Sequence, residues 1–247
     1  MKCIALIPAR YASTRLPAKL MQALGNKTVI RHTYDNTLAT ALFDQVMVVT
    51  DSDIIYQEIV SHGGNAKMSR KNHESGSDRI AEAVEDMDMD VVVNVQGDEP
   101  FVQSAPLQKL LQIFKDDKEQ KIQVASLMQV MKNKNNIEDP NYVKVAVDLN
   151  NNALFFSRSM IPYPRDGNTG IPYYEHIGIY AFRKQALLNF TQWPVSPLEA
   201  AERIECLRYL EHGISLKMVE TEYMGVEIDT AEDLLKATAL LTAKNGN

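Results

Sequence analysis

The chain has 247 residues, of which 45% are hydrophobic and 23% charged, so it can bury a core of the size expected for one large α/β domain. It contains no run of about 18 apolar residues, which argues against a membrane-spanning helix. The net charge of −6 argues against nucleic acid as the main partner. The two cysteines, Cys3 and Cys206, lie in apolar patterns typical of buried free thiols in a reducing compartment. We therefore expect a cytoplasmic protein whose main partner is neither nucleic acid nor a membrane.

The basic residues are unevenly distributed along this acidic chain. No acidic residue precedes Asp35. The basic residues in the same stretch are Lys2, Arg10, Arg15, Lys19, Lys27 and Arg31. An acidic protein that keeps its N-terminal segment purely basic is expected to hold an anion there, although chance asymmetry within a short window is the alternative.

The first hundred residues alternate between short apolar runs and helical periodicity. We expect strands at residues 2–7, 45–50, 65–68 and 91–95, and helices at residues 29–42, 53–61 and 77–87. Apolar strands separated by helices are typical of a parallel sheet covered on both faces. The predicted fold is therefore a doubly wound, mostly parallel, Rossmann-like α/β fold. Such folds bind ligands beyond the carboxyl ends of their strands. The segments that follow Ile7, Thr50 and Val95 are therefore the candidates for a binding site.

The pattern changes from about residue 122. We expect strands at residues 122–130, 142–148, 152–157 and 176–182, and helices at residues 197–211 and 230–243. Strands with few helices between them predict an embedded mixed sheet, and the long loop at residues 161–174 is expected to be functional or disordered. We predict one continuous domain, with a first half at residues 1–121, the embedded subregion at 122–225 and a closing segment at 226–247.

The segment directly after the first predicted strand, residues 7–19, combines cations with hydroxyl groups. Its hydroxyls and cations are Arg10, Ser13, Thr14, Arg15 and Lys19. A triphosphate is held by backbone amides, hydroxyls and fixed cations arranged in a loop. The segment is neither a Gly-x-x-x-x-Gly-Lys-Ser/Thr loop nor a Gly-x-Gly-x-x-Gly turn, which disfavours P-loop kinases and ordinary dehydrogenases. A triphosphate loop is the prediction, and a solvated basic loop is the alternative.

Two acidic segments are candidates for a metal site. In residues 93–100, Gly97 allows close backbone approach or an unusual turn, and Asp98 follows the end of an apolar strand. A carboxylate there is a natural Mg²⁺ ligand, although an aspartate that turns the chain is the alternative. In residues 226–233, Asp229 and Glu232 have the spacing of a helix capping box, which we favour for that segment taken alone. One carboxylate can also cap a helix and bind metal through its free oxygen.

Together these segments resemble the 3-deoxy-manno-octulosonate (Kdo) cytidylyltransferases, the CMP-Kdo synthetases of lipopolysaccharide synthesis, over residues 4 to about 235. The most specific pieces are residues 7–19, 73–79, 93–100, 142–148, 156–158, 176–180 and 196–199. The resemblance implies transfer of CMP from CTP to the anomeric hydroxyl of Kdo, with Mg²⁺ as cofactor and a homodimer as the assembly. A cytidylyltransferase for sialic acid or 8-amino-Kdo, and a non-catalytic nucleotide-binding module, are the alternatives.

The resemblance also implies roles for individual residues. The implied CTP-binding residues are Ala9, Arg10, Ser13, Arg15, Lys19, Ser75, Arg79, Gln96 and Gly97. The implied sugar-binding residues are Gln96, Arg158, His176, Tyr180 and Glu205. Asp98 and Asp229 would hold Mg²⁺ and act with the catalytic cations Arg10 and Lys19.

The implied roles extend to the three regions of the chain and to its departures from the family pattern. The first half would bind CTP, the embedded subregion would bind the sugar and dimerise, and the closing segment would complete the metal site. An apolar patch for the dimer could come from Met160, Ile161 and Tyr163. Ala18 stands where the family usually has glycine, and Cys206 stands where a glutamine is frequent beside the sugar.

Overall fold

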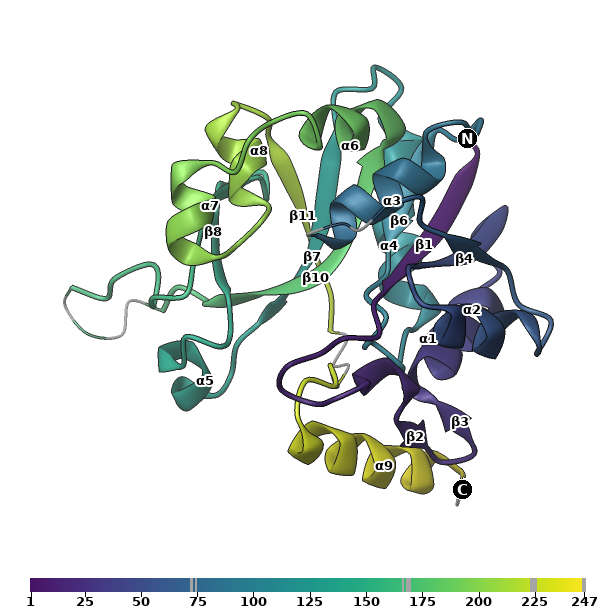
Figure 1. Ribbon diagram of the computed structural model, residues 1–247. Coiled ribbons are helices and arrows are strands. Elements are labelled where there is room, and N and C mark those ends of the chain that lie inside the picture. The colour runs from purple at the N-terminus through teal and green to yellow at the C-terminus, as the bar shows by residue number, and fades with distance from the viewer. Residues whose placement is uncertain (72, 74, 166, 168–169, 223–225, 246–247) are drawn as a thin grey trace. The chain divides into compact units, whose positions relative to one another are not determined.

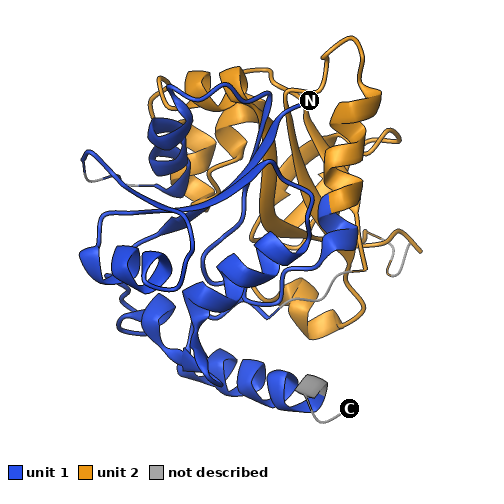
Figure 2. Ribbon diagram, turned by 90° about the vertical axis from the view of Figure 1, so that its right-hand side faces the viewer, with its two compact units in different colours: residues 1–107, 224–247 blue, residues 108–223 orange. Residues whose placement is uncertain are grey.

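In the computed structural model the chain folds into two compact units (Figure 2). Unit 1 comprises residues 1–107 and 224–247, and unit 2 comprises residues 108–223. The structure describes residues 1–71, 73, 75–165, 167, 170–222 and 226–245. The boundaries between the units fall at residues 107 and 223, whereas the sequence placed its divisions at residues 121 and 225.

Unit 1 is built on a parallel sheet with the strand order β6-β1-β4-β5. Its strands are β1 (Cys3–Ala9), β4 (Gln45–Thr50), β5 (Ala66–Met68) and β6 (Val91–Asn94). β1 lies between β4 and β6, with Ile7 opposite Val48 and Cys3 opposite Val91. The residues of β1 and β6 are almost completely buried, as expected for strands covered on both faces. The four strands predicted here are confirmed, with ends that differ by two residues at most.

The helices of unit 1 begin at side-chain caps. They are α1 (Val29–Ala39), α2 (Asp53–Val60), α3 (Gly76–Val84) and α9 (Ala231–Asn245). Thr28, Ser52 and Ser75 accept backbone N–H bonds at the first turns of α1, α2 and α3. Right-handed crossovers put α1 and α2 on one face of this sheet and α3 on the other, because α3 returns the chain from β5 to β6. The order of the unit therefore follows the doubly wound pattern expected from the sequence.

Short elements connect β1 to α1 in unit 1. They are the 3₁₀ turn η1 (Lys19–Met21) and the hairpin strands β2 (Ala23–Leu24) and β3 (Lys27–Thr28). Ala18, at the start of η1, has a φ of 49° and lies in the left-handed region. The resemblance found in the sequence implies glycine at this position, and glycine adopts that conformation without a steric cost. α9 packs beside β2 at the C-terminal end of the unit (Figure 1).

Unit 2 contains the mixed sheet predicted from the sequence. Its strands are β7 (Val124–Val130), β8 (Lys144–Val147), β9 (Ala153–Ser157), β10 (Tyr174–Arg183) and β11 (Leu216–Glu220). β10 runs antiparallel to β7 and β8, β9 runs antiparallel to β8, and β11 is parallel to β7. β11 was not predicted, although its alternation of buried Leu216 and Met218 with more exposed neighbours is a strand pattern.

The helix predicted over residues 197–211 is wrong, because the segment forms two helices. The helices of the second half of the chain are α4 (Ser104–Asp116), α5 (Lys134–Glu138), α6 (Lys184–Phe190), α7 (Pro197–Glu202) and α8 (Leu207–Glu211). Arg203 ends α7 in the left-handed conformation, with a φ of 55°. The break lets Arg208 turn back onto Glu199, with two N–H···O contacts of 2.6 Å inside the unit. α4, α5 and α6 were not predicted from periodicity.

Within the described residues, every helix is too short or too polar to cross a membrane.

Candidate active site

A cavity of about 240 Å³ lies in unit 1, beyond the carboxyl ends of β1 and β6. This is the position at which parallel α/β sheets bind ligands. The cavity brings together every residue predicted for the nucleotide and the metal. These residues are Ala9, Arg10, Ser13, Arg15, Lys19, Ser75, Arg79, Gln96, Gly97, Asp98 and Asp229. Segments that are more than two hundred residues apart in the chain therefore form one site.

Three carboxylates converge at this cavity. The backbone N–H of Ile228 donates to the carbonyl of Asp98 at 3.0 Å, which brings the two acidic segments together. Ile228 is fully buried, and the two acidic residues Glu227 and Asp229 lie on either side of it in the chain. One oxygen each of Asp98, Glu227 and Asp229 lies within 4.8 Å of the others. Hard carboxylate oxygens in such a group suit a divalent cation such as Mg²⁺.

The ammonium group of Lys19 lies between two of these carboxylates. Its Nζ is 2.5 Å from Oδ2 of Asp98 and 2.7 Å from Oδ1 of Asp229, and all three side chains are mostly buried. Burial by itself lowers the pKa of Lys19, but the two carboxylates outweigh it and raise the pKa above its ordinary value. Arg15 adds a second cation, with Nη2 at 2.9 Å from Oδ2 of Asp229. The position between the carboxylates therefore attracts positive charge.

The capping box expected at Asp229 and Glu232 is wrong by one residue. Thr230 Oγ1 accepts a hydrogen bond from the backbone N–H of Asp233 at 3.2 Å, and the Asp233 carboxylate accepts one from the N–H of Thr230 at 2.9 Å. Thr230 and Asp233 thus form the reciprocal pair at the start of α9. Because Thr230 does the capping, both carboxylate oxygens of Asp229 point to cations: Oδ1 to Lys19 and Oδ2 to Arg15.

Glu227 belongs to the carboxylate group but was not selected from the sequence. Surrounding protein atoms and the nearby charges of Asp98 and Asp229 raise its pKa to about 7. A sequence signal did exist, because Glu227 and Asp229 flank an apolar residue. In an extended segment such neighbours face the same side.

Arg79, one of the residues that line the cavity, connects the ends of β1 and β4. Its buried guanidinium donates from Nη1 to the carbonyl of Ala9 at 2.6 Å and from Nη2 to Oδ2 of Asp51 at 2.7 Å. Ala9 ends β1, and Asp51 follows β4 directly. The hydrogen bond from Arg79 lowers the pKa of Asp51. Arg79 therefore fixes the point at which the basic loop leaves β1.

Close packing surrounds Gly97 in the same cavity. A Cβ added at Gly97 would lie 3.1 Å from both the carbonyl oxygen of Pro8 and Cδ1 of Leu20, so the close approach expected from the sequence is confirmed. His73 also lines the cavity and was not selected individually; its Nε2 is 3.0 Å from Oε2 of Glu82. Glu74, within the predicted segment at residues 73–79, lies outside the described residues.

Three of the predicted sugar-binding residues, His176, Tyr180 and Glu205, lie in one largely buried group of unit 2. The ring of His176 is 5.0 Å from that of Phe156 and 5.3 Å from that of Tyr180. Burial lowers the pKa of His176 to about 4, and its Nε2 is 3.0 Å from the hydroxyl of Ser126. Burial also raises the pKa of Tyr180, with smaller contributions from Cys206 and Glu205. His176, Phe156 and Tyr180 thus supply aromatic rings to this group, and the imidazole and the phenol supply its polar atoms. None of these three side chains is a cation at neutral pH.

Cys206, the expected departure from glutamine, belongs to the same buried group. Burial raises the pKa of its thiol to about 12, although a hydrogen bond with Tyr180 acts in the opposite direction. The thiol is therefore protonated at neutral pH and serves as a small packed group beside Tyr180.

Arg158, the fourth predicted sugar-binding residue of unit 2, directs its guanidinium at backbone carbonyls. Nε donates to the carbonyl of Glu202 at 2.8 Å, Nη1 to that of Pro140 at 2.9 Å and Nη2 to that of Arg203 at 3.4 Å. These bonds connect the end of β9 with the turn before β8 and with the end of α7. Arg158 thus ties three segments of unit 2 together.

Comparisons with known proteins show the family to which the chain belongs. The family model described as cytidylyltransferase matches residues 4–220. A Flavobacterium johnsoniae protein named 3-deoxy-manno-octulosonate cytidylyltransferase is 62% identical, over 98% of this chain and 99% of its own. One of the same name from Christiangramia forsetii is 54% identical, over 98% and 97%. The solved structure of CMP:2-keto-3-deoxy-manno-octonic acid synthetase complexed with CTP matches with a TM-score of 0.93 at 38% identity, covering 99% of this chain and 100% of that one.

A parallel sheet with a basic loop and converging carboxylates beyond its strands suits nucleotidyl transfer, and the family match makes the chain a cytidylyltransferase. The chain belongs to the family of the 3-deoxy-manno-octulosonate cytidylyltransferases. The resemblance inferred from the sequence is thereby confirmed.

Proposed function

We propose that the chain transfers CMP from CTP to the anomeric hydroxyl of Kdo, giving CMP-Kdo and pyrophosphate for lipopolysaccharide synthesis. The observation that carries this proposal is the convergence of Asp98 and Asp229 on Lys19, beside the basic loop that follows β1. The names of the relatives, which cover nearly the full chain, support Kdo as the acceptor.

CTP is bound in the cavity of unit 1. The cations Arg10, Arg15 and Lys19, with the hydroxyl of Ser13, bind its phosphates. The base side is formed by Ser75 and Arg79. Arg79 contributes by holding the Ala9 carbonyl, so its effect on CTP is partly one of positioning. Gly97 lets the backbone after β6 lie against η1 and β1, because it has no Cβ to meet Leu20 and Pro8.

The carboxylates of this cavity fit a divalent magnesium ion. Asp98 and Asp229 would hold it, and Glu227 offers a third oxygen in the same group. The ammonium of Lys19, seated between Asp98 and Asp229, supports this fit because it marks a position where a cation is stabilised. When bound, Mg²⁺ would neutralise phosphate charge and lower the pKa of a coordinated hydroxyl.

The reaction is an in-line displacement at phosphorus. The anomeric oxygen of Kdo forms a bond to the α-phosphorus of CTP, and the bond from that phosphorus to the oxygen bridging the β-phosphate breaks. Pyrophosphate leaves with the bonding electrons, and the hydroxyl proton passes to solvent. Arg10, Arg15 and Lys19 offset the negative charge that grows on the phosphates, and fixed cations do this without reorganisation.

The sugar acid is bound in unit 2 by Arg158, His176, Tyr180 and Glu205. Gln96, predicted for both substrates, lines the cavity of unit 1. A carboxylate needs a cation and a polyhydroxylated ring needs polar partners, which these residue types supply. His176 serves as a neutral group, because its pKa of about 4 keeps the imidazole uncharged at neutral pH. A neutral imidazole both donates and accepts hydrogen bonds, as a sugar hydroxyl does.

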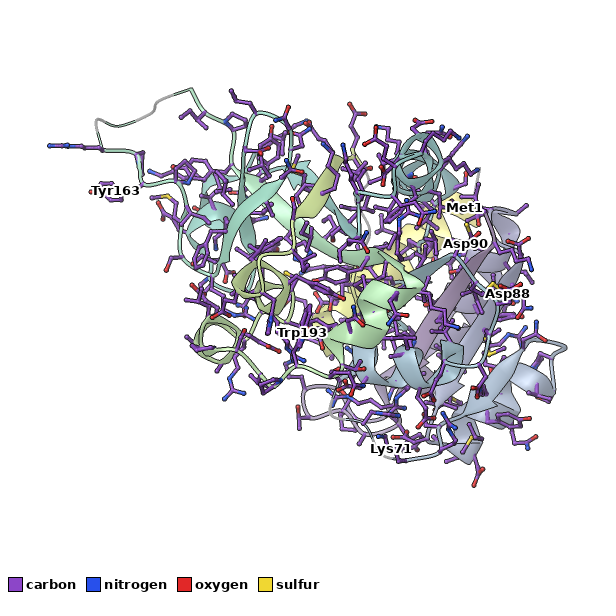
Figure 3. The ribbon with its side chains drawn as sticks, turned by 90° about the horizontal axis from the view of Figure 1, so that it is seen from above. Met1, Lys71, Asp88, Asp90, Tyr163 and Trp193 are labelled. Atoms are coloured by element: carbon purple, nitrogen blue, oxygen red, sulfur yellow. The ribbon has the colours of Figure 1, made fainter. Side chains whose placement is uncertain are left out.

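The remaining parts of the proposal concern the setting of the enzyme. We place it in the cytoplasm, where CTP is made, and as a homodimer that pairs through unit 2. Exposed apolar side chains in that unit support the pairing. They are Leu149, Leu154, Tyr163 and Ile171. Tyr163, which is 79% exposed, lies on the loop after β9 (Figure 3). Exposed apolar side chains become buried when they lie in an interface.

A direct assay tests the proposal. The purified protein is incubated with CTP, Mg²⁺ and one sugar acid at a time, namely Kdo, 8-amino-Kdo or sialic acid, while pyrophosphate release is measured. We expect release with Kdo and none when either the sugar or Mg²⁺ is omitted. Faster release with another sugar acid would reassign the acceptor, and CTP binding without any release would reassign the chain as a binding module.

A further inference from the structure

Lys144 on β8 is a fully buried lysine in unit 2. Its ammonium donates to three backbone carbonyls, those of Asp139 at 3.0 Å, Tyr142 at 2.6 Å and Arg158 at 2.5 Å. An ammonium has three N–H donors, so each one has an acceptor here. The side chain connects the turn at residues 139–142 with the end of β9.

Burying this ammonium is costly. Burial lowers the pKa of Lys144, Arg158 lowers it further, and Asp139 and Glu202 act in the opposite direction. An apolar side chain of similar length would fill the same space without removing a charge from water. Three oriented hydrogen bonds are what an apolar side chain lacks. The ammonium therefore serves to fix the carbonyls that it contacts.

Arg158 bonds back to the same turn. Its Nη1 donates to the carbonyl of Pro140, its backbone N–H donates to a carboxylate oxygen of Glu202 at 3.0 Å, and its Nε donates to the carbonyl of Glu202. Lys144 thus holds the main chain of Arg158, while Arg158 holds the turn that Lys144 also holds. The two cations act on one piece of backbone.

The bonds of Arg158 leave a defined pair of donors. Nε, Nη1 and Nη2 each donate once to a carbonyl, and a guanidinium carries five N–H groups. Among the described residues, one N–H on Nη1 and one on Nη2 are left by these bonds. A guanidinium that presents one N–H from each of its two terminal nitrogens can match the two oxygens of a carboxylate.

We propose that Lys144 is a positioning residue for the sugar acid: by holding the carbonyls of Arg158 and of the 139–142 turn, it orients the Arg158 guanidinium toward the carboxylate of Kdo. This rests on the proposed role of Arg158 in binding Kdo. A bidentate contact depends on angle as well as distance, so a small displacement of the Arg158 backbone weakens the contact between its guanidinium and the carboxylate. Lys144 itself does not touch the sugar.

The test separates positioning from general stability. In Lys144→Met we expect the KM for Kdo to rise about tenfold, because a charge-assisted contact is weakened, while the KM for CTP stays within about twofold. Steady-state pyrophosphate release measures both constants. The matched control is Lys67→Met in unit 1, whose Nζ donates to one backbone carbonyl, that of Ala83, at 2.9 Å. We expect Lys67→Met to leave both KM values unchanged.

A double-mutant cycle with Arg158→Gln shows whether Lys144 acts through the guanidinium. If it does, Lys144→Met changes the KM for Kdo by less than about twofold once Arg158 is already glutamine. The proposal is overturned if the rises in the KM for Kdo caused by the two substitutions multiply in the double variant. It is also overturned if folded Lys144→Met has an unchanged KM for Kdo, or if its KM values for Kdo and CTP rise equally.

Lys144→Gln keeps two N–H donors and is the second variant, in case Lys144→Met does not fold. We expect it to show a smaller rise in the KM for Kdo than Lys144→Met shows. If neither variant folds, Lys144 serves stability alone and the proposal fails. A wild-type protein that ignores Kdo but uses another sugar acid would instead contradict the proposed function, and the same cycle would then be measured with that acid.

Discussion

Two largely buried lysines show how differently the two units use the same side chain. In unit 1, the ammonium of Lys19 lies between two carboxylates, which raise its pKa. In unit 2, the ammonium of Lys144 lies among three carbonyls, and burial lowers its pKa. Lys19 therefore forms ion pairs, whereas Lys144 forms hydrogen bonds with uncharged backbone groups. This contrast fits the proposal that unit 1 carries the chemistry at phosphate and that unit 2 recognises the sugar.

The same contrast extends to the other residues of each site. Around Lys19 the cavity residues are cations and carboxylates near solvent, as a highly charged ligand requires. Around His176 the neighbours are aromatic rings and a hydroxyl, and burial holds titratable groups in their neutral forms. We therefore expect changes of charge in unit 1 to affect turnover, and changes of pH to affect the stability of unit 2.

The largest effect is expected from Lys19→Met. The substitution removes the cation that both carboxylates contact and that we propose to neutralise phosphate charge, so kcat should fall about 100- to 1,000-fold. Pyrophosphate release under saturating CTP and Kdo measures it. The matched control is Lys27→Met, which removes a lysine paired with Asp35 at 2.8 Å outside the cavity. Near-normal turnover in folded Lys19→Met would contradict the assignment.

The second effect concerns the stability of the protein in acid. The pKa of His176 falls from 6.5 to about 4 on folding, so the unfolded chain takes up the proton first as pH decreases. Stability from this group is complete above about pH 6.5 and is lost as the pH falls toward 4, by about 3 kcal/mol at most.

Urea unfolding at about pH 7.5 and about pH 4.5 measures this contribution. Other groups also titrate over that range, so the informative quantity is the difference between the wild type and His176→Asn. We expect His176→Asn to lose less stability between the two pH values than the wild type does. His62→Asn, which changes an exposed histidine, should keep the wild-type difference. An equal loss in the wild type and His176→Asn would show that His176 is not held neutral.

A third, smaller effect is expected from Asp51→Asn. The hydrogen bond from Arg79 gains strength from the charge of Asp51, and Arg79 in turn holds the Ala9 carbonyl beside the nucleotide cavity. We expect the KM for CTP to rise about tenfold and kcat to change less, because a charge-assisted bond becomes neutral. Asp35→Asn is the control, since its side chain is 30% exposed against 28% for Asp51 and pairs with Lys27. If the KM for CTP rises equally in Asp51→Asn and Asp35→Asn, Asp51 does not act through Arg79 on the nucleotide cavity.

What could be read from the sequence differs between the units for a physical reason. In unit 1 the basic loop and Asp98 directly follow apolar strands, and the ends of parallel strands meet at one edge, so local pattern predicts proximity. Glu227 was missed because its role depends on the Ile228–Asp98 backbone contact, which connects segments far apart in the chain. The cap at Thr230 was misplaced because Asp229 and Thr230 are both good N-cap residues.

In unit 2 the local pattern was less informative. Apolar periodicity continues through residues 197–211, but the left-handed Arg203 interrupts the helix so that Arg208 can pair with Glu199. A helix break that serves a contact inside the fold leaves no mark on periodicity. The use of Lys144 was equally hidden, because a lysine at a strand position is usually solvated, and only the folded turn shows the carbonyls that surround it.

The smallest effect tests a single backbone angle. Ala18 has a φ of 49° beside Lys19, and Ala41, after α1 and away from the cavity, has a φ of 55°. Glycine removes a steric cost of about 1–2 kcal/mol in this region but adds about 0.5–1 kcal/mol of unfolded-state entropy. Ala18→Gly and Ala41→Gly should therefore each raise the free energy of unfolding, by up to about 1.5 kcal/mol, measured by urea unfolding. Only Ala18→Gly loosens the phosphate loop, so only it should raise the KM for CTP, by about two- to threefold. Equal kinetics in both variants would show that the loop is ordered by Lys19 and its carboxylates rather than by the backbone at Ala18.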